Sequence, residues 1–376
     1  MRFRKSAPQA LIVVAALVIT ALTFGANRLF GDMTSAVERS QLDLMRSIIT
    51  FNLAGTATNS LARAEITAAD STVRKLLTQQ NRPALLAHTE AMFQEQRDKY
   101  AVDQVQFHLA PSISFLRLQN SALFGADISG YRQMVVAVNR EQVAKKGVEI
   151  ARTGPAIFGV TPIRDMAGNH VGSVEFGMDI GPLLDRLKAA YGLELSLFID
   201  EQPLRAVATG MRSGVISEHN RIGPTMRIHS TDWTLMSWLV NGDDLRIHDD
   251  PRDWVRNAGG VPYGVLLHPL RNGSGETLGA IVVARSFEST RSAAARTTVL
   301  QWLFALLGFL IVAGAILIVI RGWLVRPLEA ISARFASLGT ATRPKPDEDD
   351  RYLSVEMAAL AAEHQRIADM IDGKQK

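Results

Sequence analysis

Residues 155–178 read PAIFGVTPIRDMAGNHVGSVEFGM and are the stretch from which the fold is most clearly predicted. Residues 155–164 and 170–178 are rich in β-branched and aromatic side chains, whereas Asp165-Met-Ala-Gly-Asn169 between them combines Asp, Gly and Asn. These compositions predict two strands joined by a tight turn. We therefore expect an antiparallel hairpin within a small sheet.

The residues on either side of this hairpin complete one cycle of strands and helices. Val105, Phe107 and Leu109 alternate with polar residues, which predicts a half-buried strand. Further elements are expected at residues 115–119 (strand), 129–140 (helix) and 181–191 (helix). Strand, strand, helix, strand, strand is the order of an antiparallel sheet with helices on one side, which is a PAS-like plan.

A second cycle of the same kind follows. Strands are expected over 193–199, 225–230, 233–240, 263–270 and 277–285, and residues 243–258 are polar and expected to be partly helical. The turn Arg271-Asn-Gly-Ser-Gly-Glu276 is Gly-rich, but strands flank it, so it predicts a hairpin turn rather than a phosphate-binding loop. The predicted fold class is α+β, with a membrane-distal lobe at 104–192 and a membrane-proximal lobe at 193–298.

The segment before the first sheet is predicted to be mostly helical. Apolar residues recur over 33–100 at helical spacing, as at Val37, Leu44 and Ile48. Gly55 and Pro83 are the expected irregularities. We interpret 27–103 as a stalk that supports the lobes and packs in a homodimer.

Two uncharged apolar segments predict membrane spans. Residues 10–26 are 17 residues long, at the lower limit for a hydrocarbon core of about 30 Å, and residues 299–320 span it comfortably with 22. The first segment could instead be a cleaved signal peptide, although no clear small-residue cleavage site follows it. The second could be a buried helix, but it is long and carries no charge.

Basic residues near the two spans predict the orientation of the chain. The first span follows the N-terminal tail 1–9, which carries Arg2, Arg4 and Lys5; Arg321, Arg326 and Arg334 follow the second span, and Arg28, Arg291 and Arg296 lie on the opposite side. We expect both termini in the cytoplasm, a bacterial inner membrane, and residues 27–298 in the periplasm.

The C-terminal segment 321–376 carries two apolar seams at heptad spacing. Their residues are Leu328, Ile331, Phe335 and Leu338 after Pro327, then Leu353, Met357, Leu360, His364, Ile367 and Ile371. Any short coiled coil shows such a seam. Two short helices directly after a membrane span, with Pro in the first turn, resemble a HAMP relay, which implies a parallel four-helix bundle in a dimer.

The exported region resembles the double Cache sensor domains, closest to their third subtype. The residues that carry the resemblance are Phe107-His-Leu-Ala-Pro111, Ser114-Phe-Leu-Arg117, Phe124-Gly125, Asp127, Arg132, Gly147-Val-Glu149, Pro162 and Val171-Gly-Ser-Val-Glu-Phe-Gly177. The resemblance covers about residues 35–295 and is most specific over 104–180. It implies an extracytoplasmic sensor whose membrane-distal lobe holds a small molecule.

Six residues of that lobe are the candidate ligand-binding residues: His108, Arg117, Arg132, Glu149, Arg152 and Glu175. Arg132 is expected to open the helix, and Glu149 and Arg152 to lie in a loop covering the sheet. An arginine can bind a ligand carboxylate through two parallel hydrogen bonds, and a glutamate can bind an amine. The alternative is that these groups pair with one another as buried structural ions.

The composition excludes several functions. The chain has 376 residues and no cysteine, which excludes disulfides, Cys-ligated metals, Cys nucleophiles and c-type haem. The net charge of +4 comes mostly from the N-terminal tail, so no basic surface for nucleic acid is expected. Hydrolase and nucleotide-binding motifs and paired histidines are absent from the sequence, so we expect neither an enzyme nor a metal or cofactor.

These observations predict a chemoreceptor-like or sensor-kinase-like receptor. Because only the relay follows the second span, we expect it to act on a separate cytoplasmic signalling protein. Two alternatives remain: an envelope scaffold anchored by two spans, and part of a longer receptor.

Overall fold

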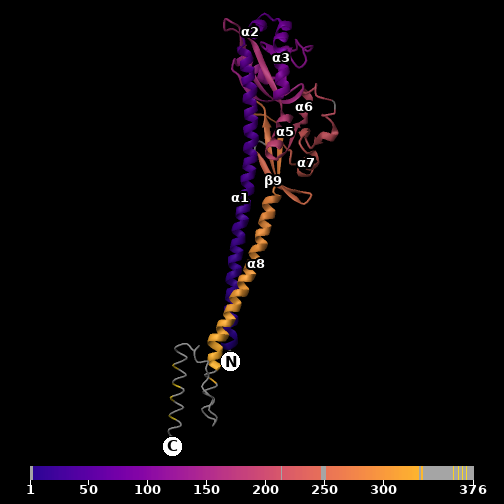
Figure 1. Cartoon of the computed structure of the whole chain (residues 1–376). Coiled ribbons are helices and arrows are strands. Elements are labelled where there is room, and N and C mark those ends of the chain that lie inside the picture. Colours follow the sequence, from indigo (N-terminus) through magenta and orange to yellow (C-terminus); the bar gives the residue numbers. More distant parts are fainter. Residues whose placement is uncertain are drawn as a thin grey trace. The chain divides into compact units, whose positions relative to one another are not determined.

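The computed structural model of the chain describes residues 3–212, 214–246 and 251–329, and the single residues 332, 359, 363, 366 and 370 (Figure 1). Contacts between Cα atoms separate Ala36–Thr290 as one compact unit from the segments before and after it. Most relay positions predicted from the sequence lie outside the described residues: Ile331, Phe335, Leu338, Met357, Leu360, His364 and Ile367. Of the other two, Pro327 is buried and Leu328 is exposed.

The first lobe is built on a five-stranded antiparallel sheet of order β2-β1-β5-β4-β3. Its elements are β1 (Val102–Leu109), β2 (Ile113–Arg117), α4 (Gln133–Glu141), β3 (Lys145–Ala151), β4 (Gly154–Arg164), β5 (His170–Asp179) and α5 (Ile180–Tyr191). The predicted β4–β5 hairpin is confirmed. Asp165 closes its turn, because its side chain accepts hydrogen bonds from the backbone N–H groups of Ala167 and Asn169.

The second lobe is a six-stranded antiparallel sheet of order β7-β8-β6-β11-β10-β9. Its elements are β6 (Glu194–Asp200), α6 (Glu201–Val207), the 3₁₀ turn Glu218–Asn220, β7 (Arg221–Ile222), β8 (Thr225–Ser230), α7 (Trp233–Leu239), β9 (Arg252–Ala258), β10 (Val261–Arg271) and β11 (Thr277–Ser286). The predicted hairpin of β10 and β11 is confirmed. Two antiparallel sheets with long helices confirm the α+β class.

Two predictions for the second lobe are wrong. Residues 233–240 are not a strand but mainly the helix α7, because Asp232 caps it by accepting from Leu235 N–H at 3.0 Å and Met236 and Leu239 bury one helical face. Residues 252–258, expected to be polar and partly helical, form β9. This strand pairs with β10 alone at the sheet edge, so exposed side chains are tolerated there.

Three helices precede the first sheet: α1 (Phe3–Ala69), α2 (Ser71–Thr78) and α3 (Arg82–Tyr100). Gly55 does not interrupt α1, contrary to expectation; the helix ends where Asp70 caps α2. Pro83 lies in the first turn of α3, where its missing N–H costs nothing. The α1 face with Met45 and Ile49 packs in the second-lobe core, and Ala64 packs in the first.

Strand β1 is buried on both faces, so the predicted half-buried strand is wrong. Val105 and Phe107 pack with Leu77, Leu85 and Phe93 of α2 and α3. The residues that alternate with them, Gln104, Gln106 and His108, are buried as well, at 2%, 5% and 0% exposure. The first lobe therefore has one apolar and one polar sheet face, and both are covered.

In the terminal segments, the helix α8 (Glu288–Val319) continues into a π-helical stretch, Ile320–Val325. Within the described residues, two helical stretches are long and apolar enough to cross a membrane, Pro8–Ala69 and Glu288–Glu329. Both contain the apolar segments identified in the sequence.

We predict that Gly159→Ala destabilises the first lobe. A Cβ atom at Gly159 would lie 2.1 Å from the backbone nitrogen of Leu61, because α1 crosses β4 there. Backbone must move to relieve this contact, and overpacking of this kind costs about 1–3 kcal/mol. Thermal unfolding checks this against Gly130→Ala, whose Cβ would meet no atom within 4 Å. Equal midpoints for the two variants would contradict the close approach.

Candidate functional site

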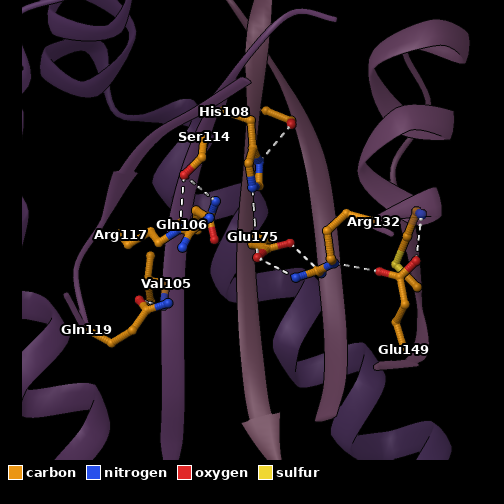
Figure 2. Close-up of polar contacts among 11 residues, drawn as sticks. Val105, Gln106, His108, Ser114, Arg117, Gln119, Arg132, Glu149 and Glu175 are labelled. Atoms are coloured by element: carbon orange, nitrogen blue, oxygen red, sulfur yellow. Dashed lines mark hydrogen bonds and ion pairs between the residues drawn. The ribbon is translucent and has the colours of Figure 1, made fainter. Parts of the chain in front are cut away.

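The polar face of the first sheet holds a buried ion network centred on Arg132 (Figure 2). Arg132 donates to both carboxylate oxygens of Glu175, at 3.0 and 2.6 Å, and its Nε donates to Glu149 at 2.9 Å. Its guanidinium also lies over the ring of Phe158, at 4.1 Å from the centroid. One arginine therefore neutralises part of two buried carboxylates.

The backbone places these charges together. Arg132 occupies the N-cap position of α4, as predicted, and Glu149 accepts from the N–H of Met134 in the first turn of that helix at 2.9 Å. A carboxylate is favoured at this end of a helix, where backbone N–H groups lack partners. Glu149 itself lies in β3, not in a covering loop as expected.

His108 faces the same network from β1. Its Nδ1 lies 3.2 Å from the hydroxyl of Ser173, and its Nε2 lies 3.8 Å from Glu175 (Figure 2). Burial lowers the pKa of His108 well below its ordinary value, and the charges of Arg132 and Arg117 lower it further. The imidazole is therefore neutral at neutral pH.

Arg117 differs from Arg132 in its partners. It is 7% exposed and donates from Nε to the hydroxyl of Ser114 at 3.0 Å, and Gln106 donates to the same hydroxyl at 2.8 Å. Within the described ranges, no carboxylate pairs with Arg117. Its charge is thus buried and held in place without an acidic partner.

An open pocket of about 390 Å³ adjoins this polar face. Its lining residues are Gln104, Gln106, Arg117, Gln119, Asn120, Leu123, Tyr131, Arg132, Ala151, Arg152, Thr153, Thr209 and Gly210. Arg152 is exposed, in the turn between β3 and β4, and its Nε lies 3.4 Å from the hydroxyl of Thr209. Residues of both lobes therefore line the pocket.

The six predicted site residues thus divide into two groups. Arg117, Arg132 and Arg152 line the pocket, whereas His108, Glu149 and Glu175 are held beside it. The pairing of Arg132 with both glutamates is the structural alternative that the sequence left open.

Sequence reasoning missed several polar residues of the pocket: Gln104, Gln106, Gln119, Asn120, Tyr131 and Thr209. A signal was present at the first two, because Gln104, Gln106 and His108 share one face of β1 through the period-2 alternation. Thr209 is far away in sequence, and nothing local connects it to this lobe. Among the described residues, no group of three or more His, Asp or Glu side chains could hold a metal ion.

We predict that Glu175 makes stability fall with rising pH. Burial raises the pKa of Glu175 to about 7, because loss of hydration outweighs the attraction of Arg132, and Glu149 raises it further. Between about pH 4.5 and 7 the folded protein then holds a proton that the unfolded chain releases, so stability decreases as pH rises through this range.

The test compares the thermal midpoints of the wild-type protein and Glu175→Gln from pH 4 to 8. His108 acts in the opposite sense below about pH 6.5, so the difference between the two proteins, rather than either profile, isolates Glu175. The difference should shift against the wild type up to about pH 7 and then level off. A constant difference would contradict the prediction.

Comparisons with known proteins were made for the whole chain. The family model dCache_3, described as the double sensory domain of two-component sensor kinase, matches residues 52–290. No curated protein matches the chain.

Three solved structures illustrate the similarity of fold. The extracellular ligand binding receptor from Desulfohalobium retbaense is 13% identical with a TM-score of 0.33, and the match covers 62% of this chain and 39% of that one. The sensor domain of the V. cholerae histidine kinase DctB is 11% identical with a TM-score of 0.39, covering 69% and 98%. The ligand-binding domain of the Pseudomonas fluorescens chemoreceptor CtaA, in complex with L-serine, is 11% identical with a TM-score of 0.34, covering 70% and 97%.

The family match includes both sheets and most of the helices that precede them. It spans well over half of the chain and agrees with the resemblance found in the sequence. The chain therefore belongs to the dCache_3 family of double sensory domains.

Proposed function

We propose that this protein is a transmembrane receptor that senses a small molecule outside the cytoplasm and relays the signal inward. The observation that carries the proposal is the pocket of the first lobe, which opens beside a buried, mutually paired ion network in a chain of sensory-domain family. A rigid, polar wall next to an open space is typical of a ligand site. We assign no enzymatic reaction to it.

The membrane arrangement is part of the proposal. The two long apolar helices would anchor residues 27–298 on the extracytoplasmic side, with both termini in the cytoplasm of a bacterial inner membrane. The tail would form a HAMP bundle through Pro327, Leu328 and the heptad positions that follow them in the sequence. A coupling free energy of about 1–3 kcal/mol between ligand and relay is enough for signalling to a separate cytoplasmic protein.

A second copy of the chain is the partner that we propose for the outer face of α1. Val37, Leu44 and Phe51 recur at seven-residue intervals and are 45%, 51% and 78% exposed, whereas Leu42, Met45 and Ile49 on the opposite face are buried. A seven-residue apolar repeat is self-complementary between parallel helices. Since α1 is continuous with the proposed first span, a partner that runs parallel to it in the same membrane meets this condition.

The alternative function is an envelope scaffold, in which the sheets bind another envelope protein and the tail only dimerises. No contact of the described residues favours it. It predicts a co-purifying protein and indifference to substitutions in the pocket.

We predict that a metabolite stabilises the purified full-length protein in nanodiscs. A ligand present at about 100 times its Kd adds about 2.7 kcal/mol to the free energy of unfolding. Thermal unfolding across a library of small metabolites measures this effect. A library without any stabilising compound, together with an unchanged cellular response of Arg117→Ala, would favour the scaffold.

We predict that single cysteines on the outer face of α1 form disulfides between two chains. The wild-type sequence has no cysteine, so Leu44→Cys and Phe51→Cys introduce the only thiol. Oxidation in membranes followed by non-reducing electrophoresis should give a dimer for both variants. Arg39→Cys, an exposed position on a different face of the same helix, is the control and should stay monomeric. Equal crosslinking at all three positions would contradict the interface.

A further inference from the structure

The charge around the pocket is one-sided. Of the described residues that line it, three are arginines and none is acidic. The two nearest buried carboxylates, Glu149 and Glu175, are directed to Arg132 and held there by hydrogen bonds of 2.6–3.0 Å (Figure 2). They are therefore not available to a ligand.

The positive charge that remains belongs to Arg117 and Arg152. Arg132 has both of its neighbouring carboxylates, but Arg117 has only the hydroxyl of Ser114 as hydrogen-bond partner, and Arg152 has the carbonyl-rich turn and a long contact to Thr209. A buried cation without an acidic partner attracts an anion strongly, because little water screens it.

Gln104 gives an independent indication of the same kind. This side chain is 2% exposed, lines the pocket, and its amide nitrogen is buried without a hydrogen-bond acceptor among the described residues. An unsatisfied buried donor is costly, and a ligand oxygen would supply the missing acceptor. Arg117 and Gln104 come from the neighbouring strands β2 and β1 and lie on the same polar face.

The second lobe closes one side of the pocket. The N–H of Gly210 donates to the carbonyl of Arg152 at 2.8 Å, and Thr209 lies next to the Arg152 side chain. A ligand that draws the Arg152 guanidinium toward itself therefore acts on the contact between the lobes. This gives the ligand a direct mechanical link to the lobe that leads into α8.

We propose that the pocket binds a small carboxylate, held by Arg117 and Gln104 on the first sheet and by Arg152 at the junction of the lobes, and that it excludes simple amines. The inference rests on the proposed sensory function and names its class of ligand. A protonated amine would meet two uncompensated arginines and no available carboxylate. A guanidinium, in contrast, can bind both oxygens of a carboxylate at once.

The experiment measures thermal stabilisation and binding calorimetry of the full-length protein in nanodiscs with matched probes. Acetate, propionate, pyruvate, succinate and benzoate are the carboxylates; ethylamine, propylamine and benzylamine are the amines. At least one carboxylate should bind and none of the amines. For that carboxylate, Arg117→Gln should weaken affinity about 10- to 100-fold, the range expected for a charge-assisted contact.

Arg152→Gln is the second variant and keeps the test valid if Arg117→Gln fails to fold. Arg152 is exposed, so its replacement leaves the core unchanged, and it should weaken binding of the same carboxylate. Arg140→Gln is the control, because Arg140 is an exposed arginine of the same lobe that does not line this pocket, and it should bind as the wild type does.

The outcomes separate this inference from the proposed function. Binding of an amine or neutral metabolite in place of carboxylates, or carboxylate binding that both arginine variants leave unchanged, overturns the inference and leaves the sensory function standing. Failure of every compound of the larger metabolite library to bind overturns both.

Discussion

The first lobe depends on one arrangement: a single guanidinium shared by two buried carboxylates. Glu149 and Glu175 come from strands β3 and β5, and Arg132 from the start of α4. Removal of one partner from a buried ion group costs about 3–5 kcal/mol, because the remaining charge stays buried without compensation. The network therefore fixes α4 against the sheet and keeps the polar face in one arrangement.

This arrangement also determines what is left for a ligand. With both carboxylates used by Arg132, the charge that faces the pocket is positive, and the free donors are those of Arg117, Arg152 and Gln104. A site that is held rigidly before the ligand arrives loses less entropy on binding. The buried ions thus act as structure, and the unpaired arginines beside them as the candidate recognition groups.

The two lobes share more than a linker. Helix α1 contributes buried residues to both cores, and Gly159 allows it to cross β4 at close range. Gly210 and Thr209 of the second lobe meet the β3–β4 turn at the pocket. A change at the pocket can therefore reach the second lobe through direct contacts, without a long intervening pathway.

The sequence by itself determined the elements whose signal is local. Turn chemistry at Asp165–Asn169 predicted the β4–β5 hairpin, and long uncharged runs predicted the apolar helices. The candidate site was predicted in part: its six residues lie at or beside one pocket, because alternation along a strand places residues on one face. Only the tertiary structure decided which charges pair. Arg132 lies 17 and 43 residues from its two glutamates, and cross-strand register and the covering helix, which no local pattern encodes, bring them together. The same holds for α7 and β9, where capping and an edge position outweighed the local pattern.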